Sequence, residues 1–397
     1  MSERGVRDLV LRGGRRWWGA GVDPEPVDLL IRGGVIAGVA AGPGDAEVVD
    51  VAGGLIVPGL VDAHCHLDKT LFGGEWVPHS AGDPLAERIA NERRRRGELG
   101  LPSVDNMAAL VERMSAAGTT HVRTHTDVYS DVGLAGIEAV RALAERFADR
   151  VTIEQVAFPQ QGILADPGTA ALLDEALRLG ATAIGGIDPA GLDRDPVRHL
   201  DVVFDLAERH GANVDIHLHD GGSLGEWELE LITERTRALG MGGMVAVSHC
   251  YALGQAGESR QDQLVAGLAE AGVALVTAAA YGFPVPPLKK LRAAGVAVAS
   301  GHDGIRDLWG PYGSGEMLER AMHLAYRSTF RRDPDIELAL ETATYGAARV
   351  LRLEDHGVGV GCRADLVVLD ARTPAEAVVT HPTPSLVLKA GAVVATA

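Results

Sequence analysis

Cysteine is scarce in this chain of 397 residues, which contains only Cys65, Cys250 and Cys362. The three residues lie far apart and their number is odd, so they form no disulfide framework of the kind found in small secreted domains. No two of them have the CxxC spacing of a structural zinc site. This pattern predicts a reducing compartment, and we expect the protein to be cytoplasmic.

Positive charge is also in short supply, because 37 lysines and arginines face 54 aspartates and glutamates, for a net charge of −17. The phosphate field of a nucleic acid or of an anionic membrane would repel such a chain. No apolar run reaches the roughly 18 residues of a membrane span, and the N-terminal stretch MSERGVRDLVLRGG lacks the apolar core of a signal peptide. We therefore expect no nucleic-acid or membrane partner, and a small neutral or cationic molecule fits better.

A GxGxxG fingerprint is missing after the first apolar strand, which disfavours a doubly wound dinucleotide-binding fold. Instead, β-branched apolar runs alternate with stretches that carry apolar residues at three- and four-residue spacing. The expected strands are 55–66, 119–128, 151–160, 181–189, 213–220, 244–250, 273–280 and 296–303, and the expected helices include 106–118, 136–149, 167–180, 196–211, 225–240 and 261–272. Eight such strands predict an α/β fold, a (β/α)8 TIM barrel.

The two ends of the chain share a different sequence pattern, in which short stretches of alternating apolar and polar residues are separated by Gly-Gly turns. RGGVIAGVA near the start resembles KAGAVVATA at the end, so we expect both termini to build one sheet. The prediction is a small β-sandwich domain from residues 1–56 plus 355–397, with a metal-dependent hydrolase barrel from 57–354 inserted in it. Two stretches lie outside the strand count. The four arginines 93–96 in ANERRRRGELG are expected on a solvated helix face, and 281–288, YGFPVPPL, as a loop over the barrel mouth.

Residues able to bind a metal or move a proton stand at the expected strand ends, where a barrel of this type keeps its active site. They are His64 and His66 on the first strand, His217 and His219 on the fifth, His249 on the sixth and Asp303 on the eighth. Taken singly, each is as well explained as a structural hydrogen bonder or, for the aspartate, a helix cap. Four strands that deliver such groups to one rim favour a shared site.

Three imidazoles and one carboxylate suit a divalent ion that keeps a position open for water. His64, His66 and His217 with Asp303 are the predicted ligands, and Asp303 can also accept the proton of that water. A second ion in barrels of this kind ordinarily needs a bridging ligand, often a lysine carbamate, at the end of strand four. The chain has GIDP there and no lysine, so the prediction is one divalent metal ion.

At this point the sequence resembles a known family, the amidohydrolase superfamily, and within it the cytosine deaminase-like branch. VDAHCHLDKT, HVRTHTDV, VAFPQQGI, VDIHLHDGG, VSHC and GHDGIRDLWGPYGSGEML match its motifs in order, across essentially the whole chain. The resemblance implies that the four predicted ligands bind zinc or, alternatively, iron. It also implies that His249 polarises the attacking water and that Gln160 contacts a substrate heterocycle.

The chain departs from true cytosine deaminases at two places. Their strand five carries His-x-x-Glu, whose Glu shuttles a proton to the ring, whereas here Asp220 takes that place and His219 precedes it. Their second acid after the strand-eight aspartate is Gly304 here. Lys69 and the His-x-His-Asp pattern are more similar to a triazine-processing branch of the group, the N-isopropylammelide isopropylaminohydrolases. There, a lysine and a second histidine supply the protic groups.

The resemblance implies hydrolysis at an sp2 ring carbon of a nitrogen heterocycle, such as an aminopyrimidine or aminotriazine, with release of ammonia or an alkylamine. Lys69, with His219 or Asp220, would protonate the leaving amine, and Gln160 and Trp309 would position the ring. We also expect a homo-oligomer. Two alternatives remain at this stage. One is a hydantoinase-like enzyme that opens the ring, and the other is a metal-dependent binding protein that has lost turnover.

Overall fold

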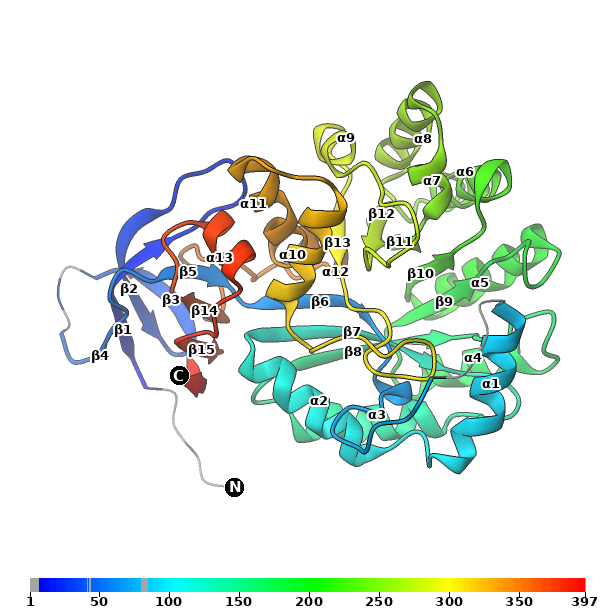
Figure 1. Cartoon of the computed structure of the whole chain (residues 1–397), viewed down its shortest axis with the longest axis horizontal. Coiled ribbons are helices and arrows are strands. Elements are labelled where there is room, and N and C mark those ends of the chain that lie inside the picture. Colours follow the sequence, from blue (N-terminus) through cyan, green and yellow to red (C-terminus); the bar gives the residue numbers. More distant parts are fainter. Residues whose placement is uncertain (1–6, 41, 43, 80–84, 397) are drawn as a thin grey trace.

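A computed structural model of the chain describes residues 7–40, 42, 44–79 and 85–396. The first six residues, part of the stretch read above for an export signal, lie outside this range. The chain forms a parallel barrel-like sheet surrounded by helices, with a second sheet beside it that contains strands from both ends of the chain (Figure 1). This architecture confirms the fold predicted from the sequence.

The strands of the barrel pair in chain order, each parallel to the next. They are β6 (Leu60–Cys65), β7 (Thr119–Asp127), β8 (Thr152–Phe158), β9 (Ala183–Ile187), β10 (Asn213–Leu218), β11 (Val245–His249), β12 (Ala274–Thr277) and β13 (Val298–Ser300). The helices are η1 (Leu67–Lys69), α1 (Leu85–Glu98), α2 (Val104–Ala116), α3 (Ala135–Arg146), α4 (Thr169–Arg178), α5 (Pro196–His210), α6 (Gly222–Ala238), α7 (Tyr251–Gln255), α8 (Glu258–Ala271), α9 (Leu288–Ala293), α10 (Met317–Arg327), α11 (Asp333–Thr342), α12 (Tyr345–Leu351) and α13 (Pro374–Thr380).

The first and last barrel strands meet at the rim that carries the predicted ligands. An isolated parallel bridge joins Cys65 to Asp303, and the Asp303 amide donates to the His64 carbonyl at 2.8 Å. The carboxyl ends of β6 and β13 are thereby held side by side. Residues that are about 240 positions apart in sequence therefore share one site.

The second sheet is mixed and runs in the order β16-β15-β14-β5-β1-β2-β3, with β4 paired to β1. Its strands are β1 (Leu9–Arg16), β2 (Glu25–Arg32), β3 (Val35–Val39), β4 (Glu47–Asp50), β5 (Leu55–Pro58), β14 (Leu366–Leu369), β15 (Leu386–Lys389) and β16 (Ala392–Thr396). The predicted union of the two termini is confirmed, and hydrogen bonds join all these strands into one sheet. The apolar run expected as one strand, 55–66, is divided: β5 belongs to this sheet, and β6 begins the barrel after the turn at Gly59.

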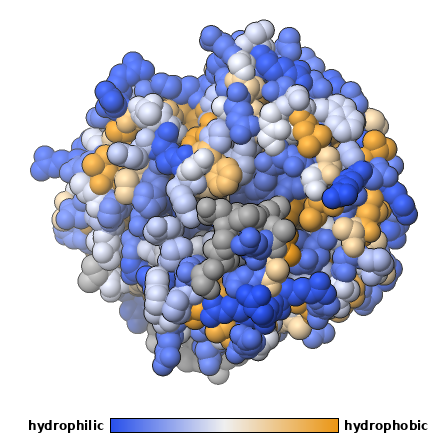
Figure 2. Space-filling view, turned by 45° about the vertical axis from the view of Figure 1, so that its right-hand side comes forward, coloured by the Kyte–Doolittle hydropathy of each residue, from blue (hydrophilic) through white to orange (hydrophobic). Residues whose placement is uncertain are grey.

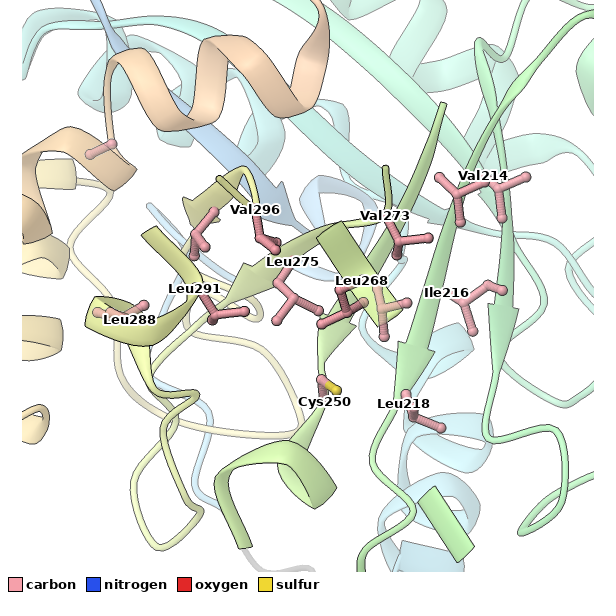
Figure 3. Close-up of a cluster of buried hydrophobic side chains, with 14 of the residues drawn as sticks. Val214, Ile216, Leu218, Cys250, Leu268, Val273, Leu275, Leu288, Leu291 and Val296 are labelled. Carbon is pink, nitrogen blue, oxygen red and sulfur yellow. The ribbon is translucent and has the colours of Figure 1, made fainter. Parts of the chain in front are cut away.

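Most of the apolar core lies between the barrel strands and the helices that cover them. Figure 3 shows Val214, Ile216 and Leu218 of β10 near Leu275 of β12 and Leu268 of α8, among other buried aliphatic side chains. Such residues alternate along each strand, so one face of the strand packs outwards against helices. The other face is free to carry polar residues towards the barrel axis and its mouth.

Helix ends follow recognisable local signals. The Ser103 side chain caps α2 by accepting from the Asn106 amide, and Asp195 caps α5 directly before Pro196. Gly211 ends α5 in a left-handed conformation. The expected helices at 106–118, 136–149, 167–180, 196–211, 225–240 and 261–272 correspond to α2, α3, α4, α5, α6 and α8.

The run of four arginines lies on α1, as expected, but it does not form a uniformly solvated face. Arg93 and Arg94 are exposed, whereas Arg96 is only 4% exposed. The prediction is wrong for Arg96 because its guanidinium pairs with two buried carboxylates, those of Asp68 and Asp127.

Residues 281–287 do form an irregular segment between β12 and α9, whereas Leu288, the last residue of the expected loop, begins α9. On the face seen in Figure 2, hydrophilic residues predominate and hydrophobic ones form small separate patches. In the described part of the chain, no helix combines the length and apolarity that a membrane span requires.

Candidate metal centre and active site

His64 is oriented by a chain of hydrogen bonds inside the barrel. Its Nδ1 lies 2.9 Å from Ser248 Oγ, and that hydroxyl donates to Asp215 Oδ1 at 2.7 Å. All three residues are buried. Contacts of this kind fix the tautomer and ring plane of a metal-binding histidine. His64 Nε2 is buried without a hydrogen-bond partner, so its lone pair is available for an ion.

His66 and Asp303 complete this side of the centre. His66 Nδ1 is 3.0 Å from the His125 carbonyl, which leaves Nε2 to face Asp303 Oδ1 at 3.3 Å. The same carboxylate oxygen lies 3.7 Å from His64 Nε2. Asp303 has a φ of +66°, a left-handed conformation that is unusual for a residue other than glycine. Such backbone strain clusters at functional sites.

His217 closes the group from β10. Its Nε2 is 3.4 Å from His66 Nε2, and its ring centroid is 4.5 Å from that of His64. His249, with a φ of +70°, lies next to both: its ring centroid is 5.0 Å from that of His217 and 4.9 Å from that of His64. The structure thus brings together all four predicted ligands and the predicted water-polarising histidine.

The electrostatics of this group suit a cation. Burial lowers the pKa of His217 and His249 well below the usual value, and it lowers that of His66, so these imidazoles are neutral and keep a lone pair. Burial alone would raise the pKa of Asp303, but its interactions with the neighbouring His64, His66 and His249 rings outweigh burial and hold the pKa well below its usual value. Donor atoms of His64, His66 and Asp303 lie within 4.8 Å of one another, and so do those of His64, His217 and His249, an arrangement that fits a divalent ion.

His219 follows β10 and faces a different partner. Its Nδ1 is 2.8 Å from Asp188 Oδ2, and its ring stacks on His249 with centroids 4.5 Å apart. Burial alone would lower the pKa of His219, but the Asp188 carboxylate outweighs it and raises the pKa above its usual value. Asp188 therefore favours the protonated form of an imidazole that stands beside the candidate metal ligands.

Asp220, the next residue, contacts the loop after β9. Its Oδ2 accepts from the Gly191 amide at 2.8 Å, and its carboxyl also hydrogen bonds to that of Glu228. Burial, followed by the nearby Asp188 carboxylate, raises the pKa of Asp220. Its contacts connect it to the loop after β9.

Lys69, Gln160 and Trp309 form a second group beside the histidines. Lys69 Nζ donates to Gln160 Oε1 and lies 5.7 Å from the centroid of the Trp309 ring. Phe158 links this group to the metal ligands, because its ring centroid is 4.1 Å from that of His217 and 5.5 Å from Lys69 Nζ.

Lys69 is only 2% exposed, which rules out a surface amine. Burial and the neighbouring carboxylates act on its pKa in opposite directions. Burial favours the neutral amine, yet the carboxylates of Asp127, Glu92 and Asp68 outweigh this and raise the pKa above its usual value. Lys69 is therefore a permanent cation in the structure.

Comparisons with known proteins agree with this geometry. A profile described as "Amidohydrolase family" matches residues 98–395. The chain is 31% identical over 353 residues to N-isopropylammelide isopropyl amidohydrolase of Pseudomonas sp. (strain ADP), and the match covers 88% of each sequence. The chain belongs to the amidohydrolase family. The resemblance drawn from its motifs is thereby confirmed.

Two solved structures are similar to this amidohydrolase over almost its full length. N-isopropylammelide isopropylaminohydrolase from Burkholderia multivorans is 45% identical, with a TM-score of 0.93 and 98% of each chain covered. The 5-methylcytosine deaminase from Klebsiella pneumoniae, solved with 5-fluorocytosine, is 27% identical, with a TM-score of 0.85 and coverage of 98% of this chain and 97% of the other.

Several residues of the amidohydrolase site were not singled out from the sequence. Phe158 ends β8 and Asp188 directly follows β9, so their position could have marked them. Glu92 of α1 accepts a hydrogen bond from Trp309 Nε1 at 2.7 Å, and no local signal in α1 points to it. His125 is fully buried, with its ring centroid 4.1 Å from that of His64.

Proposed function

We propose that this amidohydrolase cleaves an exocyclic C–N bond of a nitrogen heterocycle and releases ammonia or an alkylamine. The observation that carries the proposal is the Asp188–His219 pair stacked on His249, because it supplies a proton donor where strand five has no glutamate. The similarity to an isopropylaminohydrolase and to a 5-methylcytosine deaminase supports the same bond class.

We propose one divalent ion, zinc with iron as the alternative, held by His64, His66, His217 and Asp303. When bound, such an ion lowers the pKa of a coordinated water from about 15.7 towards 7. Asp303 is ionised and accepts the proton that the water loses. A neutral His249 donates a hydrogen bond to the oxygen as negative charge develops on it.

The leaving group departs as an amine and needs a proton. In this proposal, His219 donates it as the C–N bond breaks, and the Asp188 carboxylate stabilises the imidazolium before the transfer. General acid help of this kind is worth about 10²–10⁴-fold in rate. Lys69 stays charged and acts as a hydrogen-bond donor to the substrate rather than as the acid. Asp220 acts indirectly in this proposal, because its carboxyl accepts a hydrogen bond from the Gly191 amide and so holds the loop after β9.

In this proposal, Lys69 and Gln160 donate hydrogen bonds to one edge of the substrate ring. Because Gln160 Oε1 accepts from Lys69, we propose that its amide NH2 donates to the substrate. Lys69 and Gln160 together therefore favour a ring that presents oxo groups or acceptor nitrogens on that side. Trp309, half-buried, offers an apolar face on which a flat ring can stack.

We also propose the division into residues 1–56 plus 355–397 and 57–354, a cytoplasmic location and a homo-oligomer. The free thiols of Cys65, Cys250 and Cys362 support the location. Size-exclusion chromatography with light scattering tests the assembly.

The function is tested by incubating metal-loaded protein with a panel of aminotriazines, N-alkylaminotriazines and aminopyrimidines, and by measuring released ammonia or amine together with the ring product. Amine release with an intact ring is the expected result. A ring-opened product without amine would favour the hydantoinase-like alternative. Saturable binding without any product would favour a binding protein.

A further inference from the structure

Helix α1 buries a polar edge against the active site. Asn91, Glu92 and Arg96 are 4%, 2% and 4% exposed, although the rest of the helix is largely polar and open to water. Burying charged side chains costs free energy unless they are paired and hydrogen bonded. The groups that pair with these buried side chains therefore indicate which residues α1 positions.

The buried side chains of α1 pair with residues of the candidate active site and with carboxylates next to it. Arg96 pairs with Asp127 at 2.6 Å and with Asp68 at 2.9 Å. Asp127 in turn lies 3.0 Å from Lys69 Nζ. These two carboxylates, on the segments after β6 and at the end of β7, balance the buried cations.

Glu92 has a different contact, because it reaches the substrate-facing indole. Its Oε2 accepts from Trp309 Nε1 at 2.7 Å, while its Oε1 lies 3.8 Å from Lys69 Nζ, beyond hydrogen-bond distance. Trp309 is half-buried, so part of its ring is open, and its N–H is turned towards α1. The carboxylate therefore fixes the ring plane directly and acts on Lys69 only through its charge.

We propose that Glu92 is a positioning residue that fixes the orientation of Trp309, and that α1 is thereby part of the substrate site. The inference rests on the proposed function for its kinetic consequence, but the contact itself does not depend on any substrate. A carboxylate acceptor gives a short, strong hydrogen bond to the indole N–H, and a ring held in one plane aligns a stacked heterocycle with the catalytic groups.

Two substitutions separate positioning from charge balance. Glu92→Gln removes the charge but keeps an acceptor oxygen at the same distance from the backbone. Glu92→Asp keeps the charge but draws the acceptor back by one methylene. If Glu92 positions Trp309, we expect Glu92→Gln to keep KM within about twofold of the wild type. Glu92→Asp is expected to raise KM about 10- to 100-fold, the value of a hydrogen bond to a charged group.

A double substitution tests whether Glu92 acts through the indole. Trp309→Phe keeps an aromatic ring but removes the N–H donor. We expect Glu92→Asp combined with Trp309→Phe to have the same KM as Trp309→Phe alone, because residues that act through one contact are not additive. Glu98→Gln and Glu98→Asp, at an exposed site on the same helix, are the matched controls and should match the wild type.

An activity-independent readout keeps the test valid if the proposed function fails. The chain has five tryptophans, and Trp309→Phe identifies the indole ¹⁵N–H signal of Trp309 in a labelled sample. That signal should be protected from solvent exchange in the wild type and in Glu92→Gln, and exchange should accelerate in Glu92→Asp. If the wild-type protein showed no turnover, the proposed function would be rejected, but the exchange measurement would still test the Glu92 inference. The inference would be overturned if Glu92→Gln raised KM while Glu92→Asp kept the wild-type KM. It would also be overturned if the KM increases of Glu92→Asp and Trp309→Phe added up in the double variant, or if the Trp309 indole N–H exchanged with solvent no faster in Glu92→Asp than in the wild type.

Discussion

The His219 imidazole lies between Asp188, whose Oδ2 is 2.8 Å from its Nδ1, and His249, on which its ring stacks at 4.5 Å. The carboxylate comes from the end of β9 and the two imidazoles from the ends of β10 and β11. Because parallel strands deliver their carboxyl ends to one rim, the proposed proton donor His219 stands beside the proposed metal ligands, where the cytosine deaminases would have a glutamate. Asp188 favours the protonated form of that imidazole.

Replacing Asp188 by Asn tests this relationship. The carboxylate raises the pKa of His219, so its removal lowers that pKa, and the imidazolium is lost at a lower pH. We expect the alkaline limb of the kcat/KM profile to move to lower pH, with a smaller kcat at the optimum. Steady-state rates across the pH range measure both. An alkaline limb that stays in place would mean that another group is the acid.

A second prediction compares three residues near the leaving group. His219→Ala should lower kcat by about 10²-fold or more, the usual value of general acid help. Lys69→Ala should also lower kcat more than it weakens substrate binding, because the buried cation holds Gln160 and the ring in place. Asp220→Asn should be milder than either, since its carboxyl binds the Gly191 amide. A wild-type rate for Lys69→Ala beside a severe loss for Asp220→Asn would contradict this order and favour a shortened cytosine-deaminase-type acid.

The parts of the fold that depend on local pattern could be predicted from the sequence. β-branched runs and helical periodicity located the barrel strands, and the shared rim of parallel strands brought His64, His217 and Asp303 together as predicted. The division at Gly59 could not be predicted, because one apolar run feeds two sheets. It follows from packing, since a Cβ at Gly59 would lie 2.2 Å from the Thr120 side chain.

The role of α1 was beyond local analysis for the same reason. A run of arginines is typical of a solvated face, and the carboxylates that bury Arg96 lie about 30 positions away on both sides. Asp188 lies between these extremes, because its position after a strand was visible in the sequence but its partner was not. An acid after a strand is a frequent helix cap, and only the position of His219 in space distinguishes it from one.

The third prediction concerns the metal. Elemental analysis should give one equivalent of a divalent metal per chain, and chelation should abolish turnover and lower the Tm, because ligand binding to the native state is lost. His217→Ala and Asp303→Ala should lose metal and turnover while circular dichroism stays native. Two equivalents, both required for activity, would overturn the single-ion proposal.

The fourth prediction concerns the junction of the two sheets. Burial, with the nearby Lys389 and Arg363 charges, lowers the pKa of His356 to about 4, whereas an unfolded histidine titrates near 6.5. The unfolded state therefore binds more protons between these values, and stability should fall as pH drops from about 6.5 to about 4. His356→Gln removes this contribution, so its Tm should fall less than that of the wild type between pH 7 and pH 5. Equal losses would show that His356 does not contribute.

The last prediction tests how tightly the backbone holds the metal ligands. Gly301 lies after β13 against the main chain of β6, and a Cβ there would lie 2.5 Å from both His64 N and His64 O. Backbone atoms cannot rotate away, so Gly301→Ala must push the two strands apart, a form of overpacking that typically costs about 1–3 kcal/mol.

The displacement should fall on His64, whose ring nitrogens bind Ser248 on one side and face Asp303 on the other. We therefore expect Gly301→Ala to lose metal affinity and turnover by more than its drop in Tm would suggest. Gly267→Ala on α8, where a Cβ would meet nothing within 4 Å, is the matched control and should be neutral or stabilising by up to about 1 kcal/mol. Titration calorimetry with zinc and thermal denaturation decide the outcome: unchanged zinc affinity in Gly301→Ala would show that β6 and β13 can separate without moving the ligands.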